Sequence, residues 1–152
     1  MRSPKIAFFP GSFDPFTKGH EDIVLRALAL FDEVVIGIGQ NSHKSRYFAL
    51  DLMKSCIEKT FEGQPVRVVS YQNLTANIAK EVGAKFIIRG LRNTTDFEYE
   101  NSISQVNRHI NSDLETVFLI TSPHLAPISS TIIRDLHRYG SSIDQYLPYT
   151  LD

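Results

Sequence analysis

Short apolar runs alternate with amphipathic helical patterns along nearly the whole chain, and this alternation restricts the possible folds more than any other feature. Five runs are short and largely apolar, as expected of strands buried on both faces: 6–9, 34–38, 66–69, 86–88 and 116–120. A β-α unit repeated about five times predicts an α/β fold, with helices on both faces of a doubly wound five-stranded parallel sheet.

Between the apolar runs, apolar residues recur at helical spacing. The stripes consist of Ile23, Val24, Ala27, Leu28 and Phe31; Leu50, Met53, Ile57 and Phe61; Leu74, Ile78, Ala79 and Val82; and, more loosely, Phe97, Ile103, Val106 and Ile110. A last helix is predicted to begin near Ser129-Ser130, with Ile132, Ile133 and Leu136 facing inward.

Bulk properties exclude several classes of protein. The 152 residues fit one domain, residues 1–152, and a net charge of -1 argues against a nucleic-acid-coating surface. No apolar stretch approaches the ~20 residues that span a bilayer, and no signal peptide precedes the first strand. The single cysteine, Cys56, excludes an internal disulfide. A cytoplasmic protein that contacts neither membrane nor nucleic acid is expected.

The loop after the first strand contains the segment Thr17-Lys18-Gly19-His20. Thr17 can cap the next helix, and His20 then falls in the first turn, where free N–H groups and the helix dipole favour an anion. The alternative is an ordinary helix-capping loop with a surface histidine. The segment alone does not decide between the two.

Three further loops follow the second, fourth and fifth strands. They contain Lys44 and Arg46; Arg89-Gly90-Leu91-Arg92; and Ser129-Ser130-Thr131 with Arg134. Taken singly, each loop has an ordinary interpretation. Lys44 and Arg46 could be solvated charges, the two arginines of the 89–92 segment could pair with Asp96, Glu98 or Glu100, and the serines could form an ordinary helix cap. Together, however, all emerge at the carboxyl edge of the sheet, where such folds bind ligands. Neither G-x-G-x-x-G nor G-x-x-x-x-G-K-[ST] is present, so a phosphate site of another design is predicted.

These motifs together resemble those of a known family. Pro10-Gly11-Ser12-Phe13-Asp14-Pro15 with Thr17-Lys18-Gly19-His20, Arg89-Gly90-Leu91-Arg92 with Asp96-Phe97-Glu98-Tyr99-Glu100, and Ile128-Ser129-Ser130-Thr131 with Arg134 are similar to the Thr/His-x-Gly-His nucleotidyltransferases. Within that superfamily the chain most resembles the bacterial phosphopantetheine adenylyltransferases. The resemblance implies a Rossmann-like nucleotidyltransferase fold and direct transfer of the adenylyl group of ATP to 4′-phosphopantetheine, with dephospho-coenzyme A and pyrophosphate as products of this step of coenzyme A synthesis.

The resemblance also assigns residues. It implies that His20 stabilises the transition state and that Ser12, Lys44, Thr75 and Arg89 bind phosphopantetheine. Lys44 and Arg92 are expected to be catalytic as well, because their charges can offset the repulsion between two anionic substrates. The implied ATP site comprises Ser12, Phe13, Thr17, His20, Gly90, Leu91, Arg92, Glu100, Leu125, Ala126, Pro127, Ile128, Ser129, Ser130 and Thr131. Mg²⁺ is expected to arrive with ATP rather than in a metal site built by the protein, and a homohexamer is implied.

Two alternatives remain open on sequence grounds. The acceptor could be nicotinamide mononucleotide or a polyol phosphate, although the 89–100 region favours phosphopantetheine. A non-enzymatic nucleotide sensor is the other, but the chain shows no effector domain that would receive a signal.

Overall fold

The computed structural model, which describes residues 2–41 and 43–151, contains five strands that alternate with five α-helices. In chain order the elements are β1 (Ile6–Gly11), α1 (Lys18–Ala27), β2 (Glu33–Gly39), α2 (Leu50–Thr60), β3 (Val66–Tyr71), α3 (Thr75–Glu81), β4 (Phe86–Leu91), α4 (Thr94–Ile110), β5 (Glu115–Ile120), α5 (Ser130–Arg138) and the short 3₁₀ helix η1 (Asp144–Tyr146). The five predicted strands and the helices between them are confirmed.

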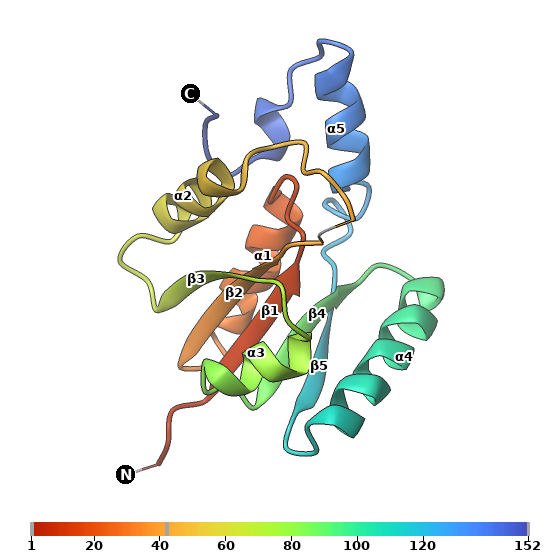
Figure 1. Ribbon diagram of the computed structural model, residues 1–152. Helices are drawn as coiled ribbons and strands as arrows, with labels where there is room; N and C mark the ends of the chain where they lie inside the picture. The colour runs from red at the N-terminus through yellow and green to blue at the C-terminus, as the bar shows by residue number, and fades with distance from the viewer. Residues whose placement is uncertain (1, 42, 152) are drawn as a thin grey trace.

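All strand pairs are parallel, and the sheet order is β3-β2-β1-β4-β5 (Figure 1). The chain moves outward from β1 to β3 and then returns to β4, so the order reverses between β1 and β4. These two strands pair only at Ala7–Phe86 and Phe8–Ile87, whereas β1 and β2 pair from Ile6 to Gly11. β1 and β4 therefore separate toward their carboxyl ends, which opens the crevice where doubly wound sheets bind ligands.

Each face of the sheet carries its own core. The first cluster packs α1, α2, α5 and the C-terminal segment against strand residues such as Phe9, Ile36 and Ile88. The second places Ala76 and Ala79 of α3 on the alternate strand positions Phe8, Val35 and Ile87. Because successive side chains of a strand point to opposite faces, both sets must be apolar, which explains the continuous apolar runs. Within the described residues, no helix has the length and apolarity needed to cross a membrane.

The predicted stripes differ from the structure at the helix ends. Phe61, Leu74 and Val82 lie just outside their helices, and Leu74 is exposed. α1 ends at Ala27, so Leu28 and Phe31 follow the helix, although both still pack on the first cluster. Ile132 is exposed because its neighbour Ile133 takes the inward position on α5.

α4 departs most from expectation. Its buried residues are Glu100 and Asn107, two turns apart on one side, while Phe97, Val106 and Ile110 stay exposed. Polar residues of α4 therefore face the sheet. Its apolar residues, Ile103 included, remain exposed, although the Phe97 ring packs edge-on against Phe118 of β5.

Candidate active site

Three neighbouring cavities lie at the carboxyl edge of the sheet. The first, of about 370 Å³, lies between α3 and α4 and is lined by Ser12, Thr75 and Arg89 among others. The second, of about 250 Å³, lies between the N-termini of α1 and α5 and the end of β4. The third, of about 380 Å³, lies between the loops after β1 and β2 and α5.

An ion pair forms the wall between the first and second cavities. Arg89 at the end of β4 donates from Nε and Nη2 to the two carboxylate oxygens of Glu100, at 2.8 and 2.7 Å. Its Nη1 donates to the carbonyl oxygen of Pro10, across the gap between β1 and β4. Both side chains line both cavities. The two parallel hydrogen bonds to Glu100 fix the orientation of the Arg89 guanidinium. Because this group lies in the wall that the two cavities share, it can contact a ligand in either one.

His20 is held in one orientation at the second cavity. The Thr17 backbone N–H donates to Nδ1 of the ring at 2.9 Å, while the Thr17 hydroxyl accepts from the His20 backbone N–H. A backbone N–H can only donate, so Nδ1 carries no proton and a neutral ring carries it on Nε2. The ring also packs against Phe13 and Phe16, at centroid distances of 5.0 and 5.3 Å. The donor left for a ligand in this cavity is therefore Nε2–H.

Burial of the imidazole, with a further contribution from the nearby Arg89 charge, lowers the pKa of His20 from 6.5 to about 3. We therefore expect the NMR signals of the His20 ring to stay constant between pH 8 and pH 5. A midpoint above pH 5 would contradict a neutral donor. Between pH 6.5 and 3 only the unfolded chain binds this proton, so the free energy of unfolding should fall with acidification by up to about 1.4 kcal/mol per pH unit.

Arg92 is the second cation of this cavity. It donates to Asp96 from its backbone N–H and from Nε, both at 3.0 Å, and hydrogen bonding from Arg92 is the main reason that the pKa of Asp96 is lowered. Both arginines of the loop are thus paired, as the alternative interpretation expected, and both still line the cavities. The two interpretations are compatible because a paired arginine keeps N–H groups for a ligand.

The opposite wall of the second cavity is the loop that leads into α5. Ser129 caps the helix by accepting from the Ile132 backbone N–H, and Ser129 and Ser130 line the cavity. The loop is attached to α1, because Ser122 donates to Asp22 at 2.8 Å and Arg26 donates to the Ile120 carbonyl at 2.7 Å. A helix N-terminus held in this way offers N–H groups and a favourable dipole to a phosphate.

The structure brings together most, but not all, of the residues predicted for the site. The second cavity is lined by nine of the residues predicted to bind ATP: Thr17, His20, Gly90, Arg92, Glu100, Leu125, Ile128, Ser129 and Ser130. Ser12, Thr75 and Arg89 meet at the first. Lys44 is exposed and lines the third cavity instead, where Ser12 joins it.

The remaining predicted ATP residues are placed less directly. Phe13 and Leu91 are buried, so each can offer a ligand mainly its backbone, and the Thr131 hydroxyl accepts from Arg134. Ala126 and Pro127 belong to the loop before α5 but line none of the three cavities.

Sequence reasoning missed the structural part that Arg46 plays. Taken singly, Arg46 could be a solvated loop charge, yet its side chain is only 17% exposed and forms hydrogen bonds to the loop after β1. Phe13 in that loop has φ of +46°, a conformation that costs a non-glycine residue about 1–2 kcal/mol. No local sequence motif indicates the hydrogen bonds of Arg46 or the positive φ of Phe13, because both depend on contacts between separate loops.

The sequence and the fold of this chain are similar to those of known proteins. Residues 8–136 match the model of the cytidylyltransferase-like family. The phosphopantetheine adenylyltransferase of Cytophaga hutchinsonii is 62% identical over 97% of this chain and 99% of its own, and that of Flavobacterium johnsoniae is 50% identical over 93% of both chains. A bifunctional NMN adenylyltransferase/ADP ribose pyrophosphatase from Francisella tularensis shares the fold, with a TM-score of 0.73 at 18% identity over 99% of this chain and 46% of its own.

Proposed function

The chain belongs to the phosphopantetheine adenylyltransferase family, and we propose that it transfers the adenylyl group of ATP to 4′-phosphopantetheine, releasing pyrophosphate and forming dephospho-coenzyme A. The observation that carries the proposal is the pair of cavities that share the Arg89–Glu100 wall at the switch point of the sheet. Two substrates bound on either side of that wall would meet beside His20 and Ser12.

The linings suggest which substrate takes which cavity. The second cavity combines the α5 N-terminus, Gly19 and Gly90 with His20 and Arg92, a set suited to a nucleotide and its phosphates. The first combines apolar Ile87 and Ile103 with polar side chains such as Asn73 and Asn107. Pantetheine is a chain of amides and alkyl groups, and this mixed lining suits it.

The proposed chemistry needs neither a general base nor a protein nucleophile. The acceptor is a phosphate monoester whose second pKa is about 6, so it is largely ionised at neutral pH. The requirement is alignment of two anions for in-line attack at the α-phosphorus and neutralisation of the charge that grows on the transferred group. Transfer would then be direct, without a covalent enzyme intermediate.

Three side chains would meet that requirement. His20 would donate from neutral Nε2 to a non-bridging oxygen of the α-phosphate, since Thr17 occupies Nδ1. Arg92, which lines the same cavity as His20, would neutralise the nucleotide phosphates. Lys44 is exposed on the loop after β2, so it would reach the acceptor phosphate by movement of its flexible side chain, with Ser12 on the same side.

Mg²⁺ fits this scheme as a partner of ATP. Among the described residues no group of three His, Cys, Asp or Glu side chains is placed to hold a metal ion, and the carboxylates of the second cavity, Asp96 and Glu100, face arginines. The nucleotide phosphates would therefore supply most ligands, as Mg²⁺ commonly binds through substrate phosphates. Bound there, the ion would add positive charge to the phosphate chain.

Self-association as a homohexamer is part of the proposal. Phe97, Val106 and Ile110 on α4 and Ile120 at the end of the edge strand β5 are 43, 58, 42 and 68% exposed. Contact with further copies would cover these apolar side chains. Light scattering should then give six times the 17.2 kDa chain mass. A cytoplasmic location is proposed with it, because the reaction consumes ATP.

An acceptor panel tests the proposed function. Pyrophosphate release would be measured with ATP, Mg²⁺ and either 4′-phosphopantetheine, nicotinamide mononucleotide or a polyol phosphate. Release with phosphopantetheine at a kcat/KM at least about 100-fold above the others is expected, because a cavity that pairs with the acceptor's polar groups rejects analogues that lack them. Preference for another acceptor would keep the adenylyltransferase chemistry but refute the substrate.

A further inference from the structure

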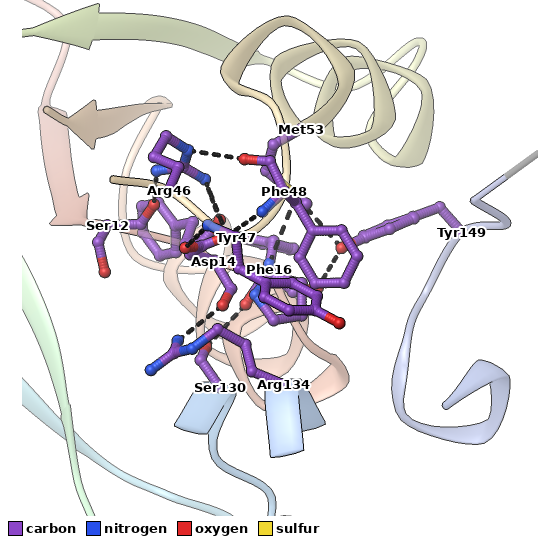
Figure 2. A network of polar contacts seen from close by, with 12 residues as sticks. Ser12, Asp14, Phe16, Arg46, Tyr47, Phe48, Met53, Ser130, Arg134 and Tyr149 are labelled. Carbon is purple, nitrogen blue, oxygen red and sulfur yellow. Dashed lines mark hydrogen bonds and ion pairs between the residues drawn. The ribbon is translucent and has the colours of Figure 1, made fainter. Parts of the chain in front are cut away.

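The segment from Ser12 to Phe16, which joins β1 to α1, is held by side chains from elsewhere in the chain. Each of its five carbonyl oxygens accepts a hydrogen bond (Figure 2). Arg46 donates to Ser12 and Phe13, Arg134 to Asp14 at 2.7 Å, Ser130 to Pro15 at 2.8 Å, and Tyr149 to Phe16 at 2.6 Å. The shape of this segment is therefore set by long-range donors.

Arg46 differs from the other donors because its contacts are reciprocal. Asp14 accepts from the backbone N–H groups of Tyr47 and Phe48, both at 2.8 Å, and lies 3.7 Å from the guanidinium of Arg46. Arg46 also donates from Nε to the Phe48 carbonyl at 3.1 Å. The loops after β1 and β2 thus hold each other because the largely buried side chains of Arg46 and Asp14 each form hydrogen bonds to the backbone of the other's loop.

The carbonyl groups that accept from Arg46 lie close to residues proposed to act on the substrates. Lys44 lies two residues before Arg46 on the same loop, and Ser12 is one of the two residues of the loop after β1 whose carbonyl oxygens accept from Arg46. Phe13, the other, has the left-handed backbone conformation, and its ring packs edge-on against His20 at 5.0 Å. The guanidinium therefore holds the carbonyls of Ser12 and of Phe13, whose ring contacts His20, from the same loop that contains Lys44. Arg46 also lines the third cavity with Ser12 and Lys44, and its hydrogen bonds within the protein go to carbonyl oxygens.

We propose that Arg46 is a positioning residue for adenylyl transfer, which aligns Ser12, Lys44 and the His20 ring through the two loops that it joins. This inference rests on the proposed function. Its physical basis is that misplacement of reacting groups by about 1 Å, caused by a change outside the chemistry, can cost about 100-fold in rate.

The test compares Arg46→Ala with Arg67→Ala. Arg67 is a matched control, because it also pairs with a carboxylate, Glu33, and donates to a backbone carbonyl, Val82, but lies on β3 away from the three cavities. We expect Arg46→Ala to lower kcat by about 10- to 100-fold and to raise the KM for phosphopantetheine, with the Kd for ATP changed less than about twofold. Arg67→Ala should leave all three within about twofold.

A purely structural role gives a different pattern. If Arg46→Ala kept kcat and the acceptor KM within about twofold, or lost ATP affinity by the same factor as kcat, the proposal would be overturned. If the alanine variant does not fold, Arg46→Gln, which keeps a neutral hydrogen-bond donor, replaces it. The same changes in kcat, acceptor KM and ATP affinity then support or overturn the proposal.

The NMR signals of His20 in the ligand-free protein separate this proposal from the proposed function. They should shift in Arg46→Ala and not in Arg67→Ala, whichever acceptor the enzyme uses. Unchanged His20 signals in Arg46→Ala would contradict the positioning role even if the wild-type protein were inactive with phosphopantetheine.

Discussion

Replacement of His20 by asparagine is expected to lower kcat by about 10²–10³-fold while the affinity for ATP stays nearly unchanged, because removal of one transition-state donor typically costs about 2.7–4 kcal/mol. Asparagine is chosen because its side-chain oxygen can take the place of Nδ1, which accepts from the Thr17 backbone N–H. It cannot reach the place of Nε2. The variant therefore keeps the helix cap and loses only the donor.

Two companion variants separate the cap from the catalysis. His20→Ala should lose as much activity and also stability, since the N–H of buried Thr17 would be left without its partner, at a cost of about 1–3 kcal/mol. His20→Gln can place an amide N–H near the position of Nε2 and should recover part of the rate. A near-normal kcat in His20→Asn, or equal losses in the glutamine and asparagine variants, would refute the role assigned to Nε2–H.

Glu100→Gln is expected to impair the binding of both substrates, because Glu100 orients the arginine that divides the two cavities. The amide places an N–H group against a guanidinium donor and leaves a partly buried charge without its carboxylate. Truncating such pairs typically costs 2 kcal/mol or more, so we expect kcat/KM for each substrate to fall by about 30-fold or more. Steady-state kinetics with either substrate varied measures this directly.

Asp96→Asn is the matched comparison. Asp96 pairs with Arg92 and lines the second cavity but not the first, and the pair is more exposed than Arg89–Glu100. Its effect should therefore be smaller and confined to ATP. An effect of Glu100→Gln on only one substrate would contradict the shared wall.

The sequence predicted the fold well because its determinants are local and repeated. Short apolar runs such as residues 34–38, separated by helical patterns, are typical of strands covered on both faces, and Thr17 and Ser129 cap their helices as their types indicate. The stripe on α4 was misleading because periodicity shows that a helix has an apolar side but not what covers it. There Glu100 faces the sheet, drawn by Arg89.

Loops that follow parallel strands meet at the carboxyl edge of the sheet, so the sequence also predicted where the site lies. It did not predict which contacts hold the side chains of the site in place. That His20 is neutral follows from a hydrogen bond and burial, neither of which its spacing reveals. Arg46 and Asp14 are 32 positions apart, and nothing in either loop signals their pairing. Side-chain contacts between loops depend on the assembled fold.

The proposed adenylyl transfer is tested most directly by pyrophosphate release from ATP by the purified wild-type protein, with and without 4′-phosphopantetheine. We expect one pyrophosphate for each dephospho-coenzyme A formed and no release without the acceptor, since in direct transfer the acceptor phosphate would itself be the nucleophile. Release without acceptor would indicate an enzyme-bound adenylyl intermediate or hydrolysis. No release with it, from a folded sample that binds ATP, would contradict the central claim.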